Sequence, residues 1–241
     1  MAGQLILISG ESATGKSTSL RKIPHQERWA YMNTESGKPL PFKNNFQPGI
    51  ITDPYEVPAS LDHIAESPQF DGAIIDSLTF LMDMYESLYV VSAKDGRAAW
   101  QNFAQFYKNL MQQNVAKALK AGKHVIFLAH TKTEQDAALN DKTFVPIKGS
   151  LANQGVEAYF SVVVSTKRVQ LEKLKDQDPA LCHITEDDEL VGYKHVFQTR
   201  LTKETVGERI RGPIGLFEKN QVYMDNDVAL LIEHMNKHFA A

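Results

Sequence analysis

The chain has 241 residues, of which 43% are hydrophobic and 23% charged, and its formal net charge is −3 at pH 7. This length fits one globular unit, so we expect residues 1–241 to form a single domain with a flexible excursion over residues 167–189. The single cysteine, Cys182, excludes an internal disulfide framework. The start of the chain has no signal-like pattern, and no run of about eighteen apolar residues occurs, which predicts a cytoplasmic protein without a membrane partner.

Apolar runs and helical spacing alternate along the chain, which is typical of an α/β fold with a mostly parallel, twisted sheet flanked by helices and with late antiparallel strands. Residues 131–148 and 202–212 lack apolar periodicity and are expected to be polar connections. In chain order we predict a strand at 4–9, a helix at 16–22, strands at 29–32 and 50–52, a helix at 55–66, a strand at 72–76, a helix at 78–90, a longer helix that ends at Gly122, a strand at 125–129, a helix at 150–158, strands at 159–165, 196–201, 214–217 and 221–224, and a helix at 228–239.

A glycine-rich motif directly follows the first predicted strand. It satisfies G-x-x-x-x-G-K-[ST] and reads Gly10-Glu11-Ser12-Ala13-Thr14-Gly15-Lys16-Ser17-Thr18. The glycines let successive backbone N–H groups point into one anion-sized hollow, and the following helix adds its positive dipole end. Lys16 would reach the β- and γ-phosphates and Ser17 would hold Mg²⁺, so the motif predicts ATP and Mg²⁺ as cofactors. The alternative is a plain glycine-rich turn between a strand and a helix.

Three further polar residues follow predicted strands and could complete the chemistry of phosphoryl transfer. Asp76 ends the apolar run 72–76, as the metal-binding acid of a Walker B strand does, although an aspartate there can also cap the next helix. Glu35 follows the second strand and could accept a proton from an attacking water. His130 ends the strand after Asp76 and could contact the γ-phosphate; an idle loop glutamate and a structural histidine are the alternatives.

Four motifs taken in order resemble the core of RecA-type recombinase ATPases, and more narrowly the small phage-encoded RecA-like ATPases of recombination and single-strand annealing. The resemblance spans about residues 4–217 and implies a RecA-like P-loop fold. The motifs are Gly-x-x-x-x-Gly-Lys-Ser at 10–17, Tyr-Met-Asn-Thr-Glu at 31–35, Ala-Ile-Ile-Asp-Ser at 73–77 and Ile-Phe-Leu-Ala-His at 126–130.

The resemblance also implies roles for single residues. Glu35 would polarise the attacking water, and His130 would sense the γ-phosphate where the family commonly has Gln. Residues 131–148 would form a DNA-contacting loop, and Lys203 would reach the nucleotide of a neighbouring subunit, with Arg209 and Arg211 as alternatives. The loop offers Lys132, Lys142 and Lys148 for phosphates and Phe144 for stacking on bases.

These expectations describe an ATPase that forms a homo-oligomer, either a ring or a filament, and acts on single-stranded DNA, with a single-strand-binding protein as a further partner. Two other functions fit the same motif. A P-loop small-molecule or nucleoside kinase would use it equally well, but such kinases usually close an arginine-rich lid, and Arg209 and Arg211 are the nearest match. A regulatory module that uses ATP only to assemble is the third.

Overall fold

The computed structural model describes residues 3–152 and 154–240. The two ends of the expected single domain, and position 153 of the helix expected at 150–158, lie outside the described residues. The chain divides into two compact units, and each is treated by itself below. The first unit comprises Met1–Leu7, His25–His130 and Val145–Phe160, and the second comprises Ile8–Pro24, Thr131–Phe144 and Ser161–Ala241.

Eight strands form a mixed sheet in the order β10-β9-β8-β1-β5-β4-β2-β3. The pairs β4–β5, β2–β4 and β2–β3 are parallel. The pairs β8–β9 and β9–β10 are antiparallel. The expected α/β fold with late antiparallel strands is therefore confirmed. The strands are β1 Leu5–Gly10, β2 Trp29–Asn33, β3 Gln47–Ile50, β4 Gly72–Asp76, β5 His124–His130, β8 Val162–Gln170, β9 Tyr193–Gln198 and β10 Tyr223–Asp225.

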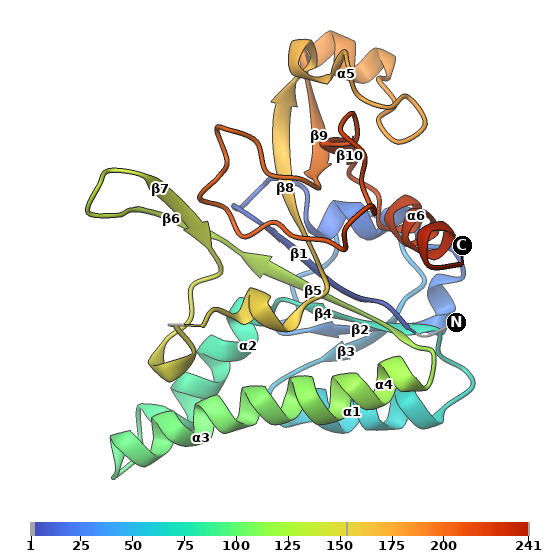
Figure 1. Ribbon diagram of the computed structural model, residues 1–241. Coiled ribbons are helices and arrows are strands. Elements are labelled where there is room, and N and C mark those ends of the chain that lie inside the picture. The colour runs from blue at the N-terminus through green and yellow to red at the C-terminus, as the bar shows by residue number, and fades with distance from the viewer. Residues whose placement is uncertain (1–2, 153, 241) are drawn as a thin grey trace. The chain divides into compact units, whose positions relative to one another are not determined.

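In the first unit, helices cover the parallel strands, and α1, α3 and α4 lie together on one side of them (Figure 1). Ile74, Ile75 and Phe127 are fully buried in these strands, as expected for central strands of an α/β sheet. The helices are α1 Glu56–Glu66, α2 Leu78–Tyr85, α3 Gly96–Asn109 and α4 Ala116–Lys120, with wider π-helical turns at Glu86–Val90 and Leu110–Val115.

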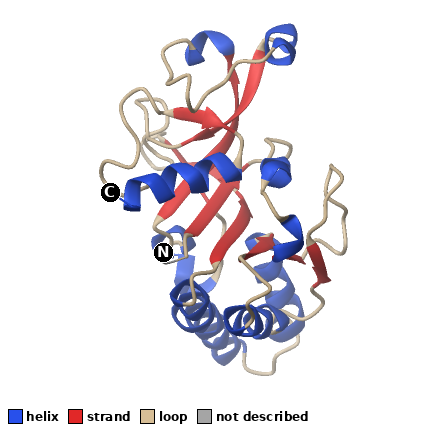
Figure 2. Cartoon of the chain, turned by 90° about the vertical axis from the view of Figure 1, so that its right-hand side faces the viewer, coloured by secondary structure: helices blue, strands red, loops and turns tan. Residues whose placement is uncertain are grey.

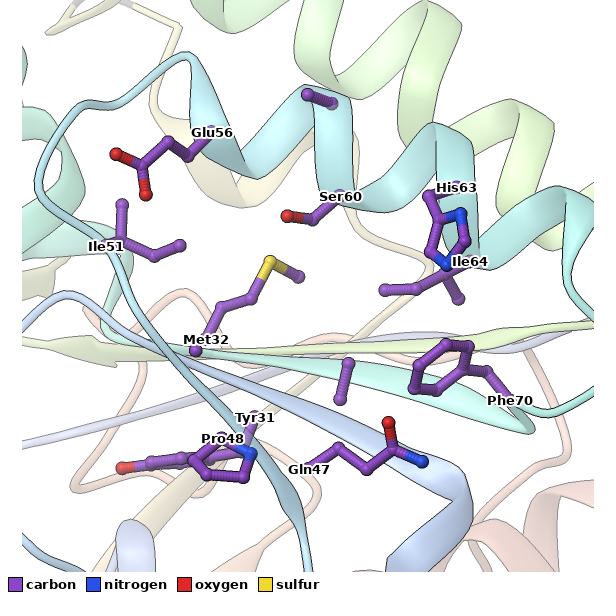
Figure 3. Close-up of a pocket in the computed structure, with 13 residues that line it drawn as sticks. Tyr31, Met32, Gln47, Pro48, Ile51, Glu56, Ser60, His63, Ile64 and Phe70 are labelled. Carbon is purple, nitrogen blue, oxygen red and sulfur yellow. The ribbon is translucent and has the colours of Figure 1, made fainter.

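A cavity of about 530 Å³ lies between α1 and the strands β2 and β3 of the first unit (Figure 3). Met32, Ile64 and Phe70 give it apolar walls, and His63 lies at its rim. Strand β3 is an edge strand, and Pro48 removes one amide donor from it, which is a common way to protect a sheet edge from pairing.

In the second unit, β8 and β9 form a long antiparallel ribbon that carries α5 (Glu186–Val191) at its far end (Figures 1 and 2). Val169, Leu174, Cys182 and Val196 form a small core beneath it, where burial raises the pKa of the Cys182 thiol to about 11. Helix α6 (Val228–Ala240) ends the described chain, and the Asp227 carboxylate caps its first turn by accepting the amides of Ala229 and Leu230.

The expectation that residues 131–148 form a polar loop is wrong for the middle of this segment. Residues Lys132–Gln135 (β6) and Asp141–Phe144 (β7) form an antiparallel hairpin. Thr133 pairs with Thr143 across it, and Asp136 accepts the amides of its turn. Cross-strand polar pairs stabilise this hairpin, so it has no apolar alternation that the sequence pattern could reveal.

The helix expected at 16–22 is a six-residue 3₁₀ helix, Ser17–Lys22. The Ser19 hydroxyl donates to Lys16 O (2.6 Å), which occupies the carbonyl that an α-helix would offer to the amide four residues on. The helix expected at 150–158 is likewise two 3₁₀ turns, Gly149–Ala152 and Val156–Tyr159, separated by Gly155 at φ 75°.

Several strand boundaries also differ from expectation. Strand β3 lies at 47–50 rather than 50–52, because its register with β2 outweighs the breaking tendency of Pro48 and Gly49. Strand β8 continues through 167–170, where its antiparallel pairing with β9 outweighs the charged side chains. No strand forms at 214–217. A turn lies there instead, in which the Leu216 amide donates to Pro213 O (3.2 Å).

Within the described part of the chain, no helix combines the length and apolar character needed to cross a bilayer.

Candidate functional site

The glycine-rich loop of the second unit is closed by its own side chains. Gly10 ends β1, and the Lys16 ammonium donates to the carbonyl oxygens of Gly10 (3.0 Å) and Glu11 (2.7 Å). The Thr14 hydroxyl donates to Glu11 O (2.8 Å) and lies 2.6 Å from the Thr166 hydroxyl of β8. Lys16 and Thr14 are buried, whereas the loop tip, residues 11–13, is exposed. The loop is therefore compact, with the Lys16 amine held against its backbone.

Two side chains outside the loop hold its backbone carbonyls. His195 on β9 contacts Thr14 O through Nδ1 (2.9 Å), and Asn226, directly after β10, donates to Gly15 O through Nδ2 (2.8 Å). Because C=O and N–H of a trans peptide point in opposite directions, these contacts turn the amides of Gly15 and Lys16 the other way. Backbone N–H groups turned away from such carbonyl partners are the groups that a phosphate-binding cradle uses.

Asp76 lies at the end of β4 in the first unit and is buried. The Tyr31 hydroxyl of β2 donates to its Oδ2 (2.8 Å). Burial and the adjacent Asp76 carboxylate raise the pKa of Tyr31 far above its usual value, so this tyrosine stays a hydrogen-bond donor. Tyr31 thereby fixes the rotamer of the carboxylate predicted to hold Mg²⁺.

The ends of β2 and β4 are joined directly after these residues. Thr34 N donates to Asp76 O (2.8 Å), and the Thr34 hydroxyl accepts from Ser77 N (2.7 Å) while donating to Ser77 O (2.8 Å). Thr34 therefore holds the backbone that precedes Glu35 against the backbone that follows Asp76.

Glu35 sits in a tight turn that the Asn33 side chain organises. Asn33 Oδ1 accepts the amides of Glu35 (2.8 Å) and Gly37 (3.3 Å), and the turn uses positive φ at Ser36 and Gly37. The Glu35 carboxylate is mostly buried, with 15% of its side chain exposed, and Lys38 Nζ lies 3.6 Å from Oε2. This glutamate is held in place, unlike an idle loop residue.

Glu35 and His130 lie together in the first unit. His130 Nε2 is 3.4 Å from Glu35 Oε1, and the His130 ring packs edge-on against Phe80 (5.8 Å between centroids). The His130 amide also donates to the Thr79 hydroxyl (3.3 Å) in the first turn of α2. The two residues that the sequence suggested separately, as base and as sensor, are thus in contact.

The lysines predicted to bind DNA all have acidic partners. Within the hairpin, Lys132 pairs with Glu134 (2.7 Å) and Lys142 with Asp136 (3.4 Å), and in the first unit Lys148 pairs with Glu86 (2.6 Å). The Phe144 ring is half-buried under the Arg209 guanidinium, 5.5 Å from its centroid. The acidic partners therefore partly neutralise the lysine charges, and Arg209 covers the Phe144 ring that was predicted to stack on bases.

Lys203 lies in an exposed turn after β9 rather than on the strand itself. Neither Lys203 nor Arg211 has an ion pair within the described ranges, whereas Arg209 covers Phe144.

The residues present fit ATP with Mg²⁺. Among residues 3–152 and 154–240, no group of three or more His, Cys, Asp or Glu side chains could hold a metal by itself. Of the two metal ligands predicted from the sequence, Ser17 lies in the second unit and Asp76 in the first.

Sequence reasoning missed four supporting residues: Tyr31, Thr166, His195 and Asn226. A tyrosine inside the otherwise apolar run 29–32 was a usable signal for the first. The other three contact the loop from positions more than 150 residues away, so no local pattern indicates them.

The comparisons with known proteins concern the family. A family model described as an AAA domain matches residues 2–207. None of the curated proteins matched the chain in sequence. The matched range covers most of the chain and includes the glycine-rich loop, Glu35, Asp76 and His130. The chain therefore belongs to the AAA domain family and is a P-loop ATPase domain.

Proposed function

We propose that this protein is a RecA-like ATPase that binds ATP with Mg²⁺, hydrolyses it, and acts on single-stranded DNA in recombination, annealing or repair. The observation that supports hydrolysis, rather than binding alone, is Glu35. Its carboxylate is mostly buried, its turn is fixed by Asn33, and it contacts His130. A glutamate placed in this way after the second strand suits the water-polarising role that the resemblance implies.

Each residue has a defined task in this proposal. Amides of Gly15 and Lys16 bind phosphate oxygens together with the Lys16 ammonium, which exchanges its carbonyl partners for them. Ser17 and Asp76 would hold Mg²⁺, and Tyr31 orients the Asp76 carboxylate. Glu35 orients water and takes its proton. The bound nucleotide and its metal supply the transferable γ-phosphoryl group and neutralise its developing charge.

The DNA-binding part of the proposal has two candidate surfaces. The first is the predicted segment 131–148, with Lys132 and Lys142 and the Phe144 ring in the hairpin and Lys148 after it, whose lysines would exchange acidic partners for phosphates. The second is the exposed segment 88–97, which ends in the first turn of α3. Lys94 and Arg97 have no ion pair within the described residues, and Leu88, Tyr89 and Val91 are exposed. Unpaired cations in the same segment as an exposed aromatic side chain suit a single strand better.

Assembly into a homo-oligomer is part of the same proposal. In the second unit, the segment after β9 exposes Leu201, Val206 and Ile214 together with Lys203 and Arg211. Exposed aliphatic side chains interspersed with unpaired cations suit a contact with another subunit. Lys203 remains our first choice for the residue that reaches a neighbour's nucleotide.

The test is the rate of phosphate release from ATP with and without single-stranded DNA, measured together with the mass of the complex. We expect Mg²⁺-dependent release that rises with DNA, and a mass of several subunits. Release that occurs only with a small acceptor would favour a kinase. ATP-dependent assembly without any release would favour the regulatory module.

A further inference from the structure

The loop of the second unit is supported by one polar side chain from each of three consecutive antiparallel strands. Thr166 lies on β8, His195 on β9, and Asn226 directly after β10. Thr166 contacts the Thr14 hydroxyl, His195 contacts Thr14 O, and Asn226 donates to Gly15 O. The C-terminal part of the chain thus forms the support on which the loop rests.

We infer that His195 and Asn226 are positioning residues of the phosphate loop, because they hold the two carbonyls whose peptide planes aim the amides of Gly15 and Lys16 at phosphate. This inference rests on the proposed nucleotide-binding function. Neither side chain needs to contact the nucleotide. Asn226 also lies beyond the family match, which ends at residue 207, so the inference gives a function to the terminal segment.

The geometry at Asn226 supports a positioning role. Its Oδ1 is buried and has no hydrogen-bond partner in the described part of the chain. Turning the amide over would put that oxygen against Gly15 O, so only Nδ2 can face the loop. A buried acceptor without a partner lowers the stability of the fold. Here that acceptor, Oδ1, belongs to the same amide group whose Nδ2 holds the Gly15 carbonyl.

Gly15 is fitted to the same two side chains. It has φ +105°, and a Cβ atom there would lie 2.5 Å from Asn226 Nδ2 and 3.3 Å from His195 Nδ1. Any larger residue would push both donors away from the carbonyls. The glycine of the motif is therefore needed for contact with the support as well as for its backbone conformation.

Neighbouring contacts hold the support itself in place. Asp227, next to Asn226, caps α6 through the amides of Ala229 and Leu230 and pairs with Lys22 at the end of the 3₁₀ helix (3.1 Å).

His195 Nδ1 must carry a proton to bond a carbonyl oxygen, and both the neutral Nδ1 tautomer and the charged ring supply one. The contact with Thr14 is therefore independent of the charge on His195.

The test compares His195→Leu and Asn226→Ala, which remove the donors, with His195→Asn, whose Nδ2 can still donate. Asn226→Asp keeps the shape but has no donor. His238→Leu and Asn220→Ala are matched controls, since both lie in the second unit and neither is hydrogen-bonded to the loop, His195 or Asn226 within the described residues. The readouts are amide hydrogen exchange of residues 10–18 without nucleotide, the affinity for a fluorescent ADP analogue with Mg²⁺, and the thermal midpoint.

We expect faster exchange across residues 10–18 and about 10- to 100-fold weaker ADP binding in His195→Leu, Asn226→Ala and Asn226→Asp, as loss of well-aimed hydrogen bonds to a charged group predicts. His195→Asn should restore most of the affinity, and the controls should match the parent. Parental exchange and affinity in the donor-less variants, or equal losses in the controls, would overturn the inference. If the parent bound no nucleotide, the proposed function would fail, and hydrogen exchange would still decide the role of the support.

Discussion

The contact between Glu35 and His130 brings together a side chain just after β2 and the side chain that ends β5. Nε2 of His130 lies 3.4 Å from Oε1 of Glu35, and both residues belong to the first unit. In the proposed mechanism, a shift of the Glu35 carboxylate toward the attacking water would lengthen its contact with His130.

Glu35→Gln should bind ATP with Mg²⁺ about as well as the parent, since the amide keeps the size and the turn of the side chain. Its rate of phosphate release should fall on the order of 10²-fold or more, because an amide cannot accept the proton. Glu27→Gln is the matched control, an exposed glutamate of the same unit. Equal losses in binding and release would show a structural glutamate instead.

Among the elements, residues 131–148 and residues 88–97 are the two candidate DNA-binding surfaces, and they give different predictions for the salt dependence of DNA binding. Replacing Lys132, Lys142 and Lys148 with Gln should lower the slope of log affinity against log salt by about 0.7 for each lysine–phosphate pair that the substitutions remove. Because acids already pair with these lysines, we expect a smaller change than for the double variant of Lys94 and Arg97. Salt titrations of single-strand binding decide between them, and a parental slope in both variants would exclude both surfaces.

Helix α5 provides a pH-dependent contribution to stability. Asp188 bonds the Thr185 amide (3.0 Å) and the Lys194 ammonium (3.0 Å). Burial alone would raise the pKa of Asp188, but the bonds from Thr185 and Lys194 outweigh it and hold that pKa below its usual value. A lowered pKa means that the stabilisation is complete above the unfolded pKa, about 4, and is lost as the pH falls through the folded value.

Asp188→Asn should therefore lower the free energy of unfolding by about 1–3 kcal/mol at pH 7, as expected for bonds to a charged group. The gap between parent and variant should shrink as the pH falls below about 4. Urea unfolding at several pH values measures this difference in unfolding free energy. Asp187→Asn, a substitution in the same helical turn, is the control, and its unfolding free energy should stay near that of the parent. A gap that persists unchanged at low pH would contradict the assignment.

For the whole molecule, the features that could be predicted from the sequence are those that depend on residues close together in the chain. The loop at 10–18, the buried run ending at Asp76, and the strand ends at Glu35 and His130 all follow from local patterns. The support of the loop does not, because His195 and Asn226 lie 181 and 211 residues from the carbonyls they hold. The hairpin was missed for another reason: polar cross-strand pairs stabilise it, so the usual apolar alternation is absent.

If Lys203 completes the site of a neighbouring subunit, hydrolysis should rise more than linearly with protein concentration. Mixing Lys203→Ala with Glu35→Gln should then restore part of the activity, because a Lys203→Ala subunit keeps its own Glu35 and receives an intact Lys203 from its neighbour. The measurement is phosphate release at a fixed total concentration. Inactive mixtures of variants that still assemble would transfer the role to Arg209 or Arg211.

Hydrolysis of ATP by this protein is checked by comparing the parent with Lys16→Ala and Asp76→Ala, because the proposed function gives Lys16 the phosphates and Asp76 the metal. The measurement is the steady-state rate of phosphate release from ATP with Mg²⁺, with thermal midpoints as a check that both variants fold. We expect clear release by the parent and loss of release in each folded variant. Release near the parental rate in either folded variant would contradict the proposed function.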